Sequence, residues 1–270
     1  MTSTQPETST LAARAAAASV ITECLRAQMS APPRSAAARI FGRTPLSAES
    51  EPWFLGALGE LDVARRLEAL GPAWRVFHSV PVGRGSSDID HVVIGPPGVF
   101  TINTKHHEGR DIWLGSKRLL VNGQRTDHLR NASFEAKRAS QRLSVAAHAL
   151  VDVAPVIVIV GARRITVRER PATIFVLRER ELVRWLCTLP AVVPPDAIEQ
   201  LADAAARPST WHDAPSLEPA DVAAFDRLRR EVDGARTRRR GWAIAALLAI
   251  FAALPFAALA AWASVMSALA

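Results

Sequence analysis

Two neighbouring predicted strands bring together four polar side chains whose types allow chemistry. Asp88 and Asp90 lie on the first strand, and Asn103 and Lys105 lie on the second. Side chains alternate between the two faces of a strand, so the members of each pair point to the same side. The hairpin can therefore gather two carboxylates, an amide and an amine on one face of a sheet.

The turn between these strands determines how the four residues face one another. Residues 95–98 read Gly-Pro-Pro-Gly, and a turn there pairs Ile94 with Val99. Antiparallel counting from that pair sets the second aspartate opposite the asparagine and the first aspartate opposite the lysine. The same register leaves an apolar set on the other face of the hairpin: Ile89, Val93, Phe100 and Ile102.

Lysine is rare in this chain, which makes the lysine at the end of the second strand notable. Among 33 Lys and Arg residues, only Lys105, Lys117 and Lys137 are lysine. A lysine ammonium can lose its proton or orient a water molecule, whereas an arginine side chain stays charged and planar. Lys105 therefore fits a chemical need, although a solvated polar face with one ion pair is an alternative that alternation alone leaves open.

These segments resemble the nuclease-related domain (NERD), a branch of the PD-(D/E)xK restriction-endonuclease-like superfamily. The resemblance rests on residues 56–60, on Asp-Ile-Asp-His at 88–91, on Gly-Pro-Pro-Gly-Val-Phe at 95–100 and on Asn-Thr-Lys at 103–105. It covers roughly residues 53–150. It implies an α/β fold in which a restriction-endonuclease-like mixed sheet is flanked by helices.

The resemblance also implies a metal-dependent site. In that superfamily, acidic residues on neighbouring strands hold a divalent metal, usually magnesium, and a lysine orients the attacking water. Matched residue by residue, Asp90 is the metal-binding aspartate and Lys105 the catalytic lysine. Glu60 on the preceding helix matches a further catalytic acid, and Thr104 would offer its backbone carbonyl to the metal. Asn103 stands where the family pattern has aspartate or glutamate.

The asparagine leaves two interpretations open. Magnesium prefers anionic oxygens, and an amide oxygen brings no charge, so we expect a weaker site. One interpretation is an active variant that binds Mg²⁺ or Mn²⁺ through Asp90, Asn103, Thr104 and Asp88 and hydrolyses phosphodiester bonds in DNA. The other is a catalytically degenerate module that binds nucleic acid or serves as a membrane scaffold.

Composition narrows the functional class. The formal net charge of +7 and a pI near 10.7 favour a polyanionic partner, either nucleic acid or an anionic lipid surface. The two cysteines, Cys24 and Cys187, lie far apart and lack the short spacing of a zinc site or a disulfide framework.

A helix predicted over residues 128–150 offers a surface for nucleic acid. It carries one apolar stripe, and four basic side chains point away from that stripe. We expect them to contact phosphates, with DNA as the partner, although a solvated helix face gives the same pattern. The four residues are Arg130, Lys137, Arg138 and Arg142.

The C-terminus predicts a transmembrane helix. Residues 241–264 contain no charged residue, and 20 helical steps separate Trp242 from Trp262, which span roughly 30 Å, the thickness of the hydrocarbon core. Arginines at 236 and 238–240 precede this run, and basic flanks stay on the cytoplasmic side. We therefore expect a single-pass protein of the bacterial cell membrane with its N-terminal domain in the cytoplasm.

Breaks in the pattern divide the chain into four predicted segments. A mobile N-terminal arm covers residues 1–50, because prolines interrupt its later part. The nuclease-like domain covers residues 51–190, and a helical linker with a proline-rich joint covers 191–240. The transmembrane helix completes the predicted organisation at 241–264.

Overall fold

The computed structural model describes residues 11–82, 88–211 and 219–269. These ranges contain the whole hairpin and all of the residues proposed above for the site. Three stretches of the predicted segments lie outside the described residues: residues 1–10 of the arm, 83–87 of the nuclease-like domain and 212–218 of the linker.

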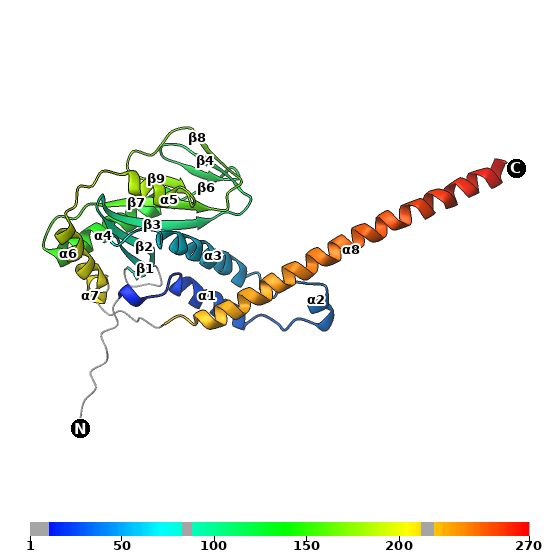
Figure 1. Ribbon diagram of the computed structural model, residues 1–270, viewed down its shortest axis with the longest axis horizontal. Coiled ribbons are helices and arrows are strands. Elements are labelled where there is room, and N and C mark those ends of the chain that lie inside the picture. Colours follow the sequence, from blue (N-terminus) through cyan, green and yellow to red (C-terminus); the bar gives the residue numbers. More distant parts are fainter. Residues whose placement is uncertain (1–10, 83–87, 212–218, 270) are drawn as a thin grey trace, which may run out of the picture. The chain divides into compact units, whose positions relative to one another are not determined.

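The chain divides into two compact units. The first unit comprises Met1–Cys24 and Glu51–Asp221, and the second comprises Leu25–Ser50 and Val222–Ala270. The first contains the strands that the structure describes, arranged as two mixed sheets flanked by helices (Figure 1). The predicted α/β class is therefore confirmed. The second unit contains the long apolar C-terminal helix.

A five-stranded mixed sheet forms the centre of the first unit, in the order β1-β2-β3-β7-β9. The first three strands are antiparallel, whereas β3, β7 and β9 run parallel. The sequence of β7, Val-Ala-Pro-Val-Ile-Val-Ile-Val, is apolar throughout because both of its faces are covered. The five strands are β1 (Arg75–Pro81), β2 (Asp88–Gly95), β3 (Gly98–His106), β7 (Val153–Val160) and β9 (Phe175–Arg178).

A second, smaller sheet has the order β6-β5-β4-β8. Its apolar side chains Ile112, Leu114 and Leu119 pack with Ile157 and Ile159 of the central sheet. The two sheets therefore share a core. The four strands are β4 (Asp111–Leu114), β5 (Leu119–Val121), β6 (Gln124–Thr126) and β8 (Arg164–Val167).

Helices cover both faces of the central sheet, as Figure 1 shows. On one face, α3 and α5 pack through Val63, Leu67 and Leu186 against the side of β3 that carries Phe100 and Ile102. On the other face, α4, α6 and α7 enclose a separate core. The helices are α3 (Ser50–Leu67), α4 (His128–Ala147), α5 (Leu182–Thr188), α6 (Pro195–Ala206) and α7 (Pro208–Trp211).

The β2–β3 hairpin has the register predicted from the sequence. Ile94 pairs with Val99, and His91 pairs with Ile102. The ladder closes at the Gly95–Gly98 pair, which leaves a two-residue Pro-Pro turn. Val93, Phe100 and Ile102 pack in one core, as predicted, whereas Ile89 packs in the separate core that contains Val92 and Ile94.

The N-terminal segment enters the core from residue 11 onward, in the stretch for which the sequence predicted a mobile arm. The 3₁₀ helix η1 (Leu11–Ala13) places the fully buried Leu11 in the core that contains β1. The backbone N–H of Ala18 donates a 2.9 Å hydrogen bond to Ser79 Oγ. Apolar contacts that the composition of the segment did not reveal therefore order it.

The second unit consists of three helical pieces. They are the end of α1 (Ala18–Met29), the short α2 (Ala36–Ile40) and α8 (Val222–Leu269). The segment Val222–Phe256 of α8 is long and apolar enough to cross a membrane. The predicted span at 241–264 therefore lies within a longer helix, which begins at Val222 and continues without a break through Gly241.

Candidate active site

The carboxylate of Asp90 joins the two strands of the hairpin. Its Oδ2 accepts a hydrogen bond from the backbone N–H of Thr104 at 2.5 Å. Burial raises the pKa of Asp90, whereas Lys105 and the bond from Thr104 lower it. The aspartate, the threonine and the lysine that the sequence proposed for one site therefore lie close together.

Glu60 reaches the same site from α3. Its side chain is 7% exposed, and the preceding residue, Gly59, allows the helix to approach β3 closely. A Cβ at position 59 would lie 3.2 Å from His106 Cβ and 3.3 Å from Thr104 Cγ2. Burial raises the pKa of Glu60 well above its usual value, and the charge of Asp90 raises it further.

Glu135 is a member of the site that the sequence reasoning missed. Asn103 Nδ2 donates a hydrogen bond of 2.5 Å to Glu135 Oε2, which brings a carboxylate from α4 to the asparagine. Burial raises the pKa of Glu135 to about 7, with a further contribution from Asp90. A signal was present, because Glu135 is three residues after Ala132 and four before Ala139, and therefore interrupts the apolar stripe of the helix.

Two histidines lie beside Lys105. His107 Nε2 and His128 Nε2 are 3.2 Å apart, and their rings stack with centroids 5.3 Å apart. Burial and the nearby lysine lower both pKa values, that of His128 to about 4. The lowered pKa values favour the neutral form of both rings, in which the Nε2–H of one ring donates a hydrogen bond to Nε2 of the other.

Asp88 has partners of its own on the N-terminal segment. Arg14 Nη2 lies 3.0 Å from Asp88 Oδ2, and the Ser19 hydroxyl donates to the same oxygen. Burial raises the pKa of Asp88, and these two contacts act against that rise. The sequence proposed Asp88 as a metal ligand, and in the structure Arg14 and Ser19 occupy this oxygen.

Glu60, Asp90 and Lys105 all lie within the part of the chain that a known family matches. The family model described as Nuclease-related domain (NERD) matches residues 55–160. Residues 55–160 form a nuclease-related domain. The resemblance stated from the sequence is therefore confirmed, and the match extends through β7. No curated protein and no solved structure matches the chain.

The oxygen atoms of the nuclease-related domain have the chemistry that a hard divalent cation requires. Asn103 Oδ1 is buried and has no hydrogen-bond partner in the described structure, whereas Asn103 Nδ2 donates to Glu135 and the next residue, Thr104, donates its backbone N–H to Asp90. Mg²⁺ prefers anionic oxygens, and an amide oxygen can add a neutral ligand beside a carboxylate. Across the described ranges, no group of three His, Cys, Asp or Glu side chains is close enough to hold an ion by itself.

The basic residues predicted on α4 of the nuclease-related domain face outward. Arg130, Lys137 and Arg138 are exposed, and Arg142 is half-buried. Arg130 forms an exposed ion pair with Asp127 at 3.1 Å, which adds little to stability because both side chains are solvated. Arg138 Nη1 donates a hydrogen bond of 3.3 Å to the Val82 carbonyl.

Glu135→Gln should stabilise the metal-free protein at pH 8 but not at pH 4. Below the ordinary pKa of about 4.5, this carboxyl is protonated in both the folded and the unfolded states. As the pH rises from there to about 7, the unfolded chain loses a proton that the folded chain retains, so wild-type stability falls. Glutamine removes this loss, worth about 2 kcal/mol after allowance for partial exposure.

The measurement is thermal unfolding of both proteins in a chelator at the two pH values. Glu68→Gln, at an exposed glutamate, is the matched control and should change the unfolding temperature at neither pH. An equal unfolding temperature for Glu135→Gln and wild type at pH 8 would contradict the raised pKa.

Proposed function

We propose that the nuclease-related domain hydrolyses phosphodiester bonds in DNA with a bound Mg²⁺ or Mn²⁺, and that α8 anchors it to a membrane. The observation that carries the proposal is the Asn103–Glu135 contact beside Asp90. A carboxylate from α4 supplies the charge that asparagine lacks at the family's second acidic position. The site therefore keeps two anionic ligands although the strand provides only one.

The residues of the site have separate roles in the proposed reaction. Asp90, Asn103 and Glu135 would hold the ion. The ion would polarise the phosphate and lower the pKa of a bound water. Lys105 donates to the negative charge that develops on the phosphate oxygens and positions the attacking water. Burial raises the pKa of Glu60 well above its usual value, and this carboxyl is the proposed group for proton transfer beside Lys105.

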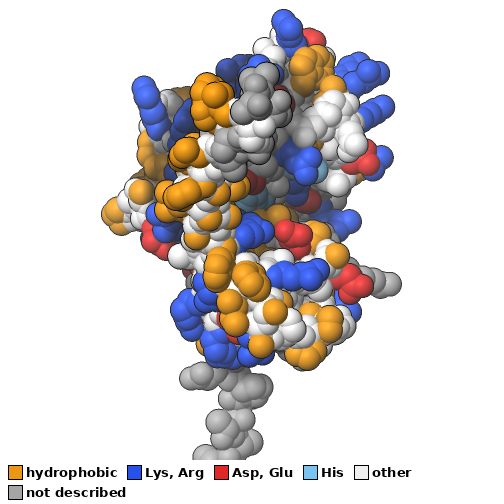
Figure 2. Space-filling model, turned by 90° about the vertical axis from the view of Figure 1, so that its right-hand side faces the viewer, with side chains coloured by type: hydrophobic (Ala, Val, Ile, Leu, Met, Phe, Trp, Pro, Cys, Tyr) orange, Lys and Arg blue, Asp and Glu red, His pale blue; other side chains and the backbone are white. Residues whose placement is uncertain are grey.

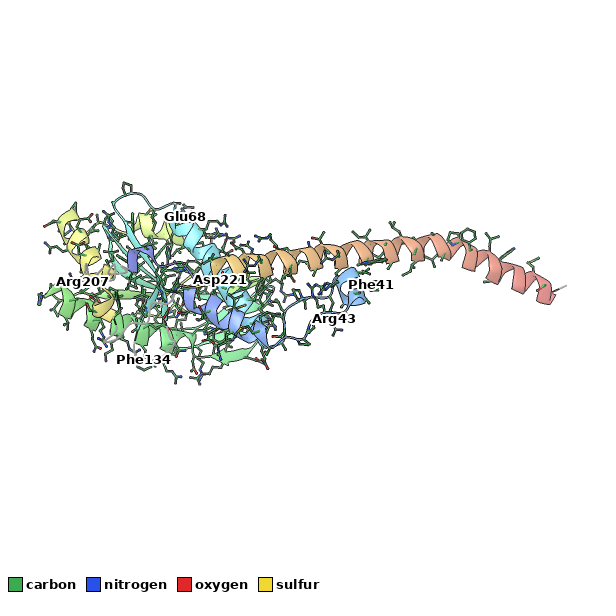
Figure 3. All side chains as sticks on the ribbon, turned by 90° about the horizontal axis from the view of Figure 1, so that it is seen from below. Phe41, Arg43, Glu68, Phe134, Arg207 and Asp221 are labelled. Carbon is green, nitrogen blue, oxygen red and sulfur yellow. The ribbon has the colours of Figure 1, made fainter. Side chains whose placement is uncertain are left out.

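The outer face of α4 is the proposed contact with DNA. Figure 2 shows that Lys and Arg side chains are spread over the visible face, so the charge of +7 alone does not locate a partner. On α4, Arg130, Lys137, Arg138 and Arg142 share the helix with Phe134, which is 63% exposed (Figure 3). Basic side chains contact phosphates, and an exposed aromatic ring can stack on a base.

The membrane anchor sets the compartment of the proposed reaction. Four exposed arginines lie just before the charge-free part of α8, and such basic flanks remain cytoplasmic. We therefore place the nuclease-related domain on the cytoplasmic side of a bacterial cell membrane. The four residues are Arg236, Arg238, Arg239 and Arg240.

A plasmid-nicking assay tests the proposal. The full chain in neutral detergent should convert supercoiled DNA to the nicked form with Mg²⁺ or Mn²⁺, and a chelator should stop the reaction. Lys105→Ala should lower the rate about 10²-fold, the usual cost of losing one stabilising donor. Lys117→Ala, at an exposed lysine in the turn between β4 and β5, should leave the rate unchanged.

The absence of cleavage by the wild type with either metal would overturn the hydrolase proposal. A gel-shift measurement on the same protein at low salt would then test the alternative, a degenerate module that only binds nucleic acid, because phosphate contacts are strongest there.

A further inference from the structure

In the second unit, the loop that follows α2 packs directly on the backbone of α8. Gly42 has a φ of +71°, and a Cβ at this position would lie 2.4 Å from the Ala235 oxygen and 2.5 Å from the Arg239 nitrogen. No side chain fits at either distance. Only glycine therefore permits both this backbone conformation and this close approach.

The end of α2 and the loop after it are joined to α8 where the charged part of α8 gives way to the apolar part. Arg238 Nε donates to the Arg39 carbonyl at 3.0 Å, and Trp242 Nε1 donates to the Ile40 carbonyl at 2.9 Å. The rings of Phe41 and Trp242 lie with centroids 5.0 Å apart. These contacts hold the loop at the boundary between the last arginine and the charge-free run.

Large apolar side chains project from this boundary. Ile40 is 56% exposed, Phe41 57% and Trp242 47%. Figure 3 shows Phe41 and Arg43 on the loop next to the ribbon of α8. Exposed apolar groups rimmed by basic ones are typical of a surface that enters the interfacial region of a membrane, where tryptophan is also enriched.

A cavity of about 600 Å³ lies within the same unit, and its charged lining is mostly basic. Arg34, Arg39 and Arg238 contribute to the lining, against the single carboxylate of Glu231, which pairs with Arg34 at 2.8 Å. Three cations and one anion leave a net positive lining. Ile40 also lines the cavity, so its rim continues into the apolar surface.

We propose that this cavity, the headgroup pocket, binds the phosphate headgroup of an anionic phospholipid while Ile40 and Phe41 insert into the same leaflet. The assignment is carried by Ile40, which lines the pocket and whose carbonyl accepts a hydrogen bond from Trp242 at the start of the apolar part of α8. A lipid next to the helix brings its phosphate to the arginines and its acyl chains to the apolar side chains. The inference rests on the membrane anchoring proposed above and is independent of the nuclease chemistry.

Spin-label accessibility tests whether the loop enters the membrane. Cys187→Ser first removes the exposed thiol from the full chain. Three proteins are then made on this background, each with one spin label, at Ile40→Cys, Lys117→Cys or Leu248→Cys. In vesicles of phosphatidylcholine and phosphatidylglycerol, labels at 40 and 248 should be reached by oxygen and shielded from a water-soluble nickel chelate. The label at 117 should be open to the chelate.

Each contrary result has a separate meaning. A label at 40 that is as open to the chelate as the label at 117, while the label at 248 is shielded, overturns the insertion of the loop. Open labels at both 40 and 248 overturn the membrane anchor and this inference with it. Gly42→Ala in the Ile40→Cys protein should expose the label, because the loop can no longer pack on α8.

Lipid enrichment tests the headgroup pocket. Spin-labelled phosphatidylglycerol should associate with the full chain more strongly than spin-labelled phosphatidylcholine does. Arg39→Gln should weaken that association about fivefold, the expected contribution of one basic side chain near an anionic surface. Arg118→Gln, at an exposed arginine of the first unit, should have no effect. Equal association of the two lipids with wild type overturns the pocket.

Discussion

Glu135→Gln is expected to slow metal-dependent cleavage of DNA about 10³-fold, and adding Asn103→Asp is expected to restore most of the rate. The ion contributes several kcal/mol of charge stabilisation in the transition state, which corresponds to about three orders of magnitude. Glutamine keeps the size of the side chain and the hydrogen bond from Asn103, but removes the second negative charge from the site. Aspartate at 103 returns a negative charge to the strand, two residues before Lys105.

The measurement is the initial rate of plasmid nicking by the full chain at saturating Mn²⁺, together with the Mn²⁺ concentration that gives half of the maximal rate. Glu68→Gln, at an exposed glutamate, is the matched control and should cleave at the wild-type rate. A wild-type rate in Glu135→Gln would exclude Glu135 as a ligand. A double variant that folds but remains inactive would show that the two positions are not interchangeable.

The pair Asn103 and Glu135 shows where sequence reasoning reached its limit. The hairpin register follows from a turn of four residues and from the alternation of apolar side chains, so Asp90, Asn103 and Lys105 could be grouped without coordinates. Glu135 lies 32 residues beyond Asn103, on an element whose approach depends on tertiary packing. The only local sign was its place on the apolar stripe of α4.

The environment of Asp88 depended even more on distant residues. Arg14 lies 74 residues before Asp88, in a segment whose alanine-rich composition indicated no fixed position. Burial of Leu11 fixes this segment, and burial of one apolar side chain cannot be read from composition. The elements with a strong local pattern were more predictable, since α4 begins at its predicted start, residue 128.

Leu11→Ala is expected to lower the free energy of unfolding of the first unit by about 3 kcal/mol. The side chain is fully buried in the core formed with Phe77 and Val80 of β1, and truncation of a buried leucine leaves a cavity that the surroundings fill only in part. The cost is large because Leu11 anchors the segment that carries Arg14. Loss of this anchor also removes the ion pair from Asp88.

Denaturant unfolding of the full chain in neutral detergent, followed by tryptophan fluorescence, measures this change. Leu150→Ala is the matched control, because Leu150 is fully exposed and its truncation should cost less than about 0.5 kcal/mol. Arg14→Gln should cost less than Leu11→Ala, since it breaks one ion pair and creates no cavity. If Leu11→Ala unfolds at the same denaturant concentration as the control, the N-terminal segment does not contribute to the core, and Asp88 would be left free to join the ligands of the nuclease-related domain.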